Sequence, residues 1–129
     1  MLVIDASCLV EVLVGGSDAA RLAARLRADS DQLAPHLIDL EVFGVIRWER
    51  LRGTLDPTAA VQAVEDLRDW PGERIPHGPL LTRAYELHET VRGWDAMYVA
   101  LAEAFAVPLL TRDRRLAAAL GPTCEIELI

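Results

Sequence analysis

The stretch RGWDAMYVALAEAFAVPLLTRDRR, residues 92–115, decides the fold that the sequence predicts. Residues 94–105 carry apolar side chains at helical spacing, and the acidic Asp95 lies near the start of this predicted helix. Residues 107–111 are a short apolar run typical of a buried strand, and Asp113 follows it closely. A helix that leads directly into a buried strand is typical of α/β proteins, in which strands and helices alternate.

The N-terminus repeats the second half of this design. Residues 2–4, Leu-Val-Ile, form an apolar run that stops at Asp5. Because the run is short and does not alternate with polar residues, it predicts the central strand of a parallel sheet, covered on both faces. Further strands are expected near residues 33–34, 74–76 and 124–129, and the proline at the end of 74–76 favours an edge position.

Two helices between these strands have predicted core faces. In the helix after Pro35, Glu41 is predicted to lie within an apolar stripe formed by Leu37, Leu40, Gly44, Val45 and Trp48. The next helix starts at Asp56-Pro57, where aspartate suits the cap and proline the first turn. Its predicted inward residues are Val61, Val64 and Leu67. The tryptophans Trp48, Trp70 and Trp94 are interpreted as packing residues rather than as a platform for bases.

Composition limits the classes of function. A chain of 129 residues with 52% hydrophobic residues fits one domain over residues 1–129. The net charge of −7 argues against a generally basic surface, so any site for RNA or DNA must be local. All 13 basic residues are arginine, which excludes P-loop and Schiff-base lysines. Cys8 and Cys124 match no metal or disulfide spacing and are expected to be free thiols. No stretch is apolar enough to span a bilayer, and we expect a soluble, cytoplasmic protein.

Four acidic residues occupy unusual places. Asp5 and Asp113 follow predicted strands, whereas Glu41 and Asp95 lie on predicted core-facing positions of helices. Because the carboxyl ends of parallel strands share one edge of a sheet, all four side chains are expected to converge there. Their mutual repulsion would be relieved by a divalent cation, and oxygen ligands favour Mg²⁺ or Mn²⁺ over Zn²⁺.

Each acidic residue also has a simpler explanation. Asp5, Asp95 and Asp113 all precede helical residues and could be N-caps. Glu41 could instead pair with a buried arginine such as Arg47. These alternatives weaken when the four positions are considered together, because one site explains all of them.

Polar neighbours of the four acids have two interpretations as well. Ser7 and Thr111 either support a carboxylate or a water at the site or bond to nearby backbone. Arg112, Arg114 and Arg115 flank Asp113 and either bind phosphate beside the metal or form a solvated face.

Taken together, these segments resemble a PIN domain, specifically a VapC-type toxin ribonuclease of a bacterial toxin–antitoxin pair. The matching pieces are LVIDAS at 2–7, EV at 41–42, WDAMYVALAE at 94–103 and LLTRD at 109–113. The resemblance implies a three-layer α/β/α sandwich with a five-stranded parallel sheet and metal-dependent cleavage of single-stranded regions of RNA. Asp5, Glu41, Asp95 and Asp113 match the family's acidic quartet, and Ser7 and Thr111 match its supporting polar positions. Trp94 stands where the family commonly has tyrosine.

The acids suggest a hydrolytic mechanism. We hypothesise that Asp5, Asp95 and Asp113 hold Mg²⁺, or Mn²⁺, which activates a water and stabilises charge on the scissile phosphate of RNA. Glu41 would hold or deprotonate that water. Two alternative functions stay open: a PIN-like module that binds RNA or protein without cutting, and a metal-dependent DNA nuclease. A phosphatase is disfavoured, since Ser7 interrupts the Asp-x-Asp pair that it needs.

The resemblance also implies protein partners. A cognate VapB-like antitoxin is expected to cross the site with its C-terminal segment, and a homodimer is expected too. We hypothesise that the segment lays an apolar face near Leu9, Val12, Leu13 and Val45 and directs an Arg or Lys at the four acids.

Overall fold

A five-stranded parallel sheet forms the centre of the computed structural model, which describes residues 1–129. Its strand order is β3-β2-β1-β4-β5. The register places Val3 beside both Leu33 and Leu109. The strands are β1 (Leu2–Ile4), β2 (Gln32–Pro35), β3 (Glu73–Ile75), β4 (Leu109–Thr111) and β5 (Ile126–Leu128). The predicted central strand, its parallel pairing with the strand before Asp113 and the edge position of β3 are therefore confirmed.

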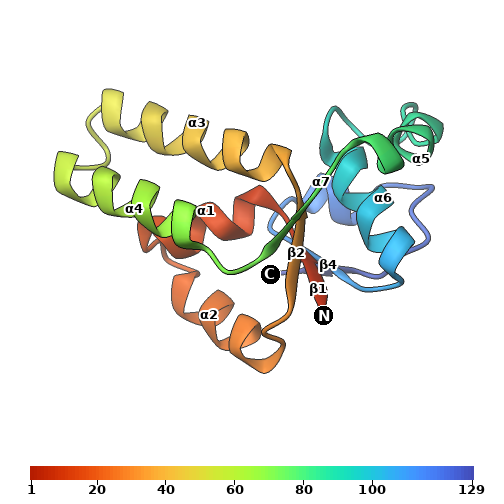
Figure 1. Ribbon diagram of the computed structural model, residues 1–129, viewed down its shortest axis with the longest axis horizontal. Helices are drawn as coiled ribbons and strands as arrows, with labels where there is room; N and C mark the ends of the chain where they lie inside the picture. Colours follow the sequence, from red (N-terminus) through yellow and green to blue (C-terminus); the bar gives the residue numbers. More distant parts are fainter.

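Helices cover both faces of this sheet and complete a three-layer α/β/α sandwich. Figure 1 shows α1 to α4 on one side of the strands and α5 and α6 on the other. Double coverage leaves β1 and β4 fully buried, as their uniformly apolar sequences require. No helix has the length and apolar character needed to cross a membrane. The helices are α1 (Ala6–Val14), α2 (Ala19–Ala28), α3 (Leu37–Leu51), α4 (Pro57–Asp69), the 3₁₀ helix η1 (Gly78–Leu80), α5 (Leu81–Glu86), α6 (Asp95–Phe105) and α7 (Arg114–Ala117).

The structure corrects the predicted core faces of α3 and α4. Both helices are apolar around much of their circumference, so the spacing of the sequence allowed two faces. On α4 the small Ala60 and Ala63 face inward, while the larger Val61 and Val64 are exposed. On α3 the buried residues are Leu37, Ile38, Val42 and Ile46, while Leu40, Val45 and Trp48 are exposed.

The predicted packing role is confirmed for one of the three tryptophans. Trp70 is buried, but Trp48 and Trp94 are 54% and 68% exposed. Trp48 stacks instead against the guanidinium of Arg52, at 3.9 Å from the ring centroid. The cysteines are both free thiols, as expected.

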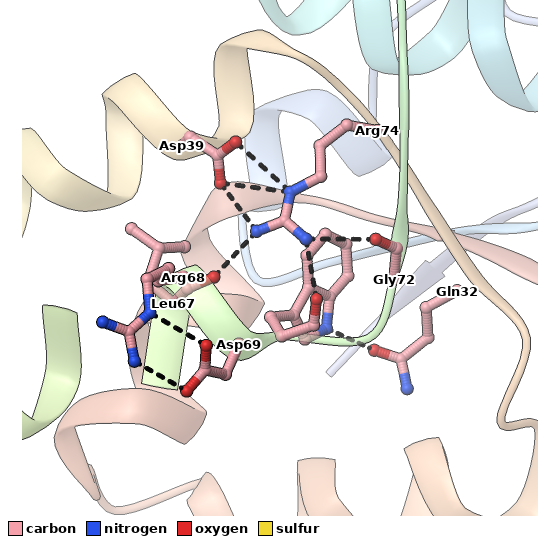
Figure 2. Close-up of polar contacts among 8 residues, drawn as sticks. Gln32, Asp39, Leu67, Arg68, Asp69, Gly72 and Arg74 are labelled. Carbon is pink, nitrogen blue, oxygen red and sulfur yellow. Dashed lines mark hydrogen bonds and ion pairs between the residues drawn. The ribbon is translucent and has the colours of Figure 1, made fainter. Parts of the chain in front are cut away.

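Arg74 fastens the edge strand β3 to α3 and α4 (Figure 2). Its Nη2 donates to Asp39 Oδ1 on α3 at 2.9 Å and to the Leu67 carbonyl at 2.7 Å, and Nη1 donates to the Trp70 carbonyl at 2.7 Å. These carbonyls lie at the C-terminal end of α4, where helical carbonyls lack intrahelical partners. Trp70 Nε1 in turn donates to Gln32 on β2 at 3.0 Å. One arginine therefore sets the position of two helices that lead to and from the sheet.

Candidate active site

Asp5 follows β1 and is held by two hydroxyl groups. Thr111 Oγ1 donates to Asp5 Oδ2 at 2.8 Å, and Ser7 Oγ donates to the same oxygen at 2.6 Å. Backbone amides orient both hydroxyls, because Asp113 N donates to Thr111 Oγ1 and Arg112 N donates to Ser7 Oγ. Burial raises the pKa of Asp5, and the two hydroxyls oppose that rise. Its side chain does not cap α1, and both hydroxyl bonds fall on Oδ2, while the backbone amides of Ala6 and Ser7 also oppose the rise in its pKa.

Glu41 lies near the start of α3 and is bound by a buried tyrosine of α6. Tyr98 Oη donates to Glu41 Oε2 at 2.5 Å, and the tyrosine ring is fully buried. Burial raises the pKa of Glu41 to about 7; the charges of Asp5 and Asp95 add to the rise, and the tyrosine hydrogen bond opposes it. The alternative partner Arg47 is exposed. Glu41 is half-buried at the border of the core, rather than within the stripe that the sequence predicted.

Asp95 is the first residue of α6, and its side chain does not serve as the N-cap. Its pKa is raised to about 6, mainly by burial and also by the charges of Asp5 and Asp113. Arg92 and Arg115 oppose this effect. The carboxylate of Asp95 is thus exposed to the fields of two acids and two arginines at once.

Asp113 caps a helix with one of its two carboxylate oxygens. Its Oδ1 accepts hydrogen bonds from Arg115 N at 2.7 Å and Leu116 N at 3.4 Å, which caps α7. The N-cap explanation therefore holds for one oxygen of Asp113, and its second oxygen accepts neither of these bonds.

The four acids lie at the carboxyl edge of the sheet and influence one another. Asp5 raises the pKa of both Glu41 and Asp95, and Asp113 raises that of Asp95. As placed, however, no three acidic, histidine or cysteine side chains are close enough to ligate one ion directly. A cage of three carboxylates is not required for Mg²⁺, which is usually bound through one or two carboxylates and keeps several waters.

The donor chemistry of this edge suits Mg²⁺ or Mn²⁺. It offers carboxylate oxygens, and the charges of these carboxylates repel one another. Cys8 lies nearby, but burial, with the charge of Asp5 adding to it, raises the pKa of its thiol to about 12. A neutral thiol does not compete with the carboxylates for a metal ion.

The three predicted arginines differ in what they contact. Arg112 Nη1 pairs with Glu11 Oε2 at 3.0 Å, and Nη2 pairs with Asp18 Oδ2 at 2.8 Å. These carboxylates fix the Arg112 guanidinium on α1 and at the start of α2, whereas Arg114 is exposed. Arg115 instead lies at the acidic edge, beside Asp95.

A small hollow of about 80 Å³ adjoins the carboxylates on this side. Arg92 and Arg115 contribute positive charge to it, and its other lining residues include Asp95, Asp113 and Thr90. Sequence reasoning missed Arg92, although its position three residues before Asp95 is a usable signal. It also missed Tyr98, which follows Asp95 by three residues on the same helical face and carries a hydroxyl on an otherwise apolar face.

The sequence and the fold match known proteins over nearly the whole chain. The model of the PIN domain family matches residues 2–120. Ribonuclease VapC1 of Mycobacterium tuberculosis is 41% identical over 128 residues, which cover 98% of this chain and 96% of that relative. The crystal structure of PAE2754 from Pyrobaculum aerophilum aligns with a TM-score of 0.70 at 23% identity, over 98% of this chain and 83% of that one. The crystal structure of VapBC2 from Rickettsia felis, bound to a DNA fragment from its promoter, aligns with a TM-score of 0.67 at 12% identity, over 98% and 97%. The chain therefore belongs to the PIN-domain family and, within it, to the VapC ribonucleases.

Proposed function

We propose that this protein is a Mg²⁺-dependent endoribonuclease toxin that hydrolyses phosphodiester bonds in RNA at the edge formed by Asp5, Glu41, Asp95 and Asp113. The observation that carries the proposal is the burial of these acids beside one another: burial raises the pKa of Glu41 and Asp95 toward neutrality, and the charges of the neighbouring acids add to the rise. Carboxylates that resist ionisation gain free energy from a bound cation, because the cation stabilises their charged forms. Without the cation, their repulsion costs free energy.

Asp5, Asp95 and Asp113 would hold the ion, directly or through water. Bound there, Mg²⁺ would offset negative charge on the scissile phosphate and lower the pKa of an attacking water. Ser7 and Thr111 keep Asp5 in one orientation through the bonds to its Oδ2.

Glu41 would accept the proton of the attacking water. A general base works best when its pKa lies near the working pH, and the value of about 7 fits neutral conditions. Tyr98 holds one carboxylate oxygen of Glu41, so the other is free to receive the proton. Arg92 and Arg115 would attract a neighbouring phosphate of the strand, since both face the hollow beside Asp95.

The test is cleavage of a mixed RNA pool by the purified protein, with Mg²⁺ or with excess chelator. We expect cleavage only with the metal, and we expect Asp5→Asn to abolish it while the protein remains folded. Asp66→Asn is the matched control, because Asp66 is an exposed residue of α4 that bonds only to Gln62. Full cleavage after exhaustive chelation would rule out the metal mechanism.

One residue of the docking surface that the sequence suggested for the antitoxin is inaccessible, because Leu9 is buried, whereas Val45 is exposed and Val12 and Leu13 are half-buried. More exposed apolar side chains gather between α3 and α4, where two adjoining hollows of about 450 Å³ each are lined by Phe43 and Val64. Leu40 borders both this groove and the hollow next to Glu41. We infer that the C-terminal segment of a VapB-like antitoxin lies in the groove and passes Leu40 to reach the acids.

Co-expression with the protein encoded beside this gene tests the partner. We expect a stable complex that does not cut RNA, and Phe43→Glu should weaken it without affecting cleavage by the free toxin. A neighbour that binds equally well to the Phe43→Glu variant would refute this docking surface. Sedimentation of the toxin alone would show whether it forms the expected homodimer.

A further inference from the structure

An apolar hollow of about 480 Å³ lies next to Glu41 and shares no lining residue with the hollow of Arg92 and Arg115 next to Asp95 and Asp113. It is enclosed by the start of α3, by η1 and α5, and by the start of α6. Its walls include Leu40, Glu41, His77, Leu81, Trp94 and Met97. Glu41 therefore belongs both to the acidic edge and to this hollow.

The hollow has large apolar side chains that no other part of the chain covers. Trp94 is 68% exposed, Leu81 53% and Leu40 75%. Trp94 also directly precedes Asp95, so the indole sits one residue from the acidic edge. The opposite wall is fixed, because Leu37 N donates to His77 Nε2 at 2.9 Å. An exposed indole at the entrance of an apolar pocket, next to a charged reaction site, is suited to a flat aromatic ligand.

We propose that this hollow binds one nucleobase of the RNA strand whose phosphodiester lies at the acids, with the base stacked on Trp94. The inference rests on the proposed function and adds to it a subsite that recognises a base. Free anions are disfavoured there, since Glu41 forms one wall. A base is favoured because it is uncharged, has apolar faces and is joined by its ribose to the phosphate that the acids would process.

The hollow lined by Arg92 and Arg115 indicates how the RNA strand would be oriented across the acids. With about 80 Å³ it is far smaller than the apolar hollow, and two arginines line it. The smaller side, where two arginines lie next to Asp95 and Asp113, suits a phosphate group held beside a metal ion, and the larger, apolar side suits a base. A strand crossing the acids would therefore present its backbone to one side and a base to the other.

Cleavage of single-stranded RNA oligonucleotides that each lack one base near the cut site tests the proposal. We expect the wild type to lose roughly tenfold in kcat/KM when one particular base is missing, mainly through KM. Trp94→Ala should lose a similar factor on intact RNA and then be insensitive to removal of that base. Trp94→Tyr should recover most of the loss, because it restores an aromatic ring. Trp48→Ala is the matched control, since Trp48 is an exposed tryptophan outside the hollow, and it should cut like the wild type.

If the loss from Trp94→Ala and the loss from the missing base multiply when the two changes are combined, the proposal is overturned, because two groups in contact cannot act independently. Unchanged cleavage by Trp94→Ala would overturn it as well. A second copy of the chain is another candidate occupant. If Leu81→Glu dissociates a dimer and reduces cutting of all RNAs alike, without any base dependence, the hollow is a dimer contact and the proposal fails.

A binding measurement separates this proposal from the proposed function. Tryptophan fluorescence is recorded while a short single-stranded RNA is added in the presence of chelator, where no cleavage is expected. We expect quenching that requires the base, disappears in Trp94→Tyr and persists in Trp48→Phe. If the protein quenches in this way but cuts no RNA with Mg²⁺, the proposed function is wrong and the base pocket stands. If it cuts RNA but shows no base-dependent quenching, the pocket is wrong and the nuclease stands.

Discussion

Glu41→Gln should stabilise the metal-free protein at alkaline pH and have little effect at acid pH. The pKa of Glu41 is about 7 in the folded chain, against an ordinary value of 4.5. The folded state therefore holds the proton more tightly than the unfolded state, and the stability of the protein falls as pH rises from about 4.5 to about 7. Glutamine carries no charge, so it removes this loss, and it can still accept the hydrogen bond of Tyr98.

The expected size follows from the same shift. Between pH 5.5 and pH 8, full linkage would amount to about 2 kcal/mol. Because Glu41 is only half-buried and its charge is partly screened by solvent, we expect about 1 kcal/mol. For a chain of this size, that corresponds to an advantage in Tm of Glu41→Gln over the wild type that is about 4 °C larger at pH 8 than at pH 5.5.

Thermal unfolding at both pH values, with chelator and then with Mg²⁺, measures the effect. Glu89→Gln removes the same charge at an exposed position and is the control. With Mg²⁺ the advantage of Glu41→Gln should shrink or reverse, because the ion stabilises the charged form of the wild type. A Tm increase of the same size at pH 5.5 and pH 8, or a decrease at pH 8, would refute the idea that repulsion and burial act on Glu41.

Three further substitutions test other contacts. Tyr98→Phe should lower kcat about tenfold with little change in KM, because it removes the bond that orients Glu41; unchanged single-turnover rates would contradict this. Arg74→Lys should destabilise the fold by about 2 kcal/mol in urea unfolding, since lysine cannot reproduce the forked contacts of the guanidinium, whereas Arg68→Lys, in an exposed pair, should leave the unfolding curve unchanged. Arg115→Ala should weaken RNA binding and lower the slope of its salt dependence by about one, and an unaltered slope would exclude a phosphate contact.

The sheet could be predicted from the sequence because its strands have one interpretation. Residues 2–4 and 109–111 are too short and too apolar to be anything but strands covered on both faces, and each ends beside an acidic residue. Once two such strands pair in parallel, Asp5 and Asp113 must lie at the same edge. Composition and local pattern were therefore enough to predict which strand lies at the centre.

Helix faces and ion pairs were less predictable, for two physical reasons. On α4 the small Ala60 and Ala63 face inward while Val61 is exposed, so the larger apolar residue did not indicate the buried face of the helix. Contacts between distant residues leave no local pattern. Arg112 binds Asp18, which is 94 positions away in the chain, and nothing in the sequence around Arg112 distinguishes it from Arg115.

Charged and apolar side chains are unevenly distributed around the four acids, and this distribution affects how a chain of net charge −7 could bind RNA. Most of the affinity of proteins for nucleic acid usually comes from many phosphate contacts, and it falls steeply with salt. Here only Arg92 and Arg115 line the hollow beside the acids. The remaining affinity would have to come from the metal ion and from the base stacked on Trp94. We therefore expect RNA binding that depends weakly on salt and strongly on one base, and that is measurable without Mg²⁺ and tightened by it. Such binding would also be selective, because a base contact distinguishes sequences and a phosphate contact does not.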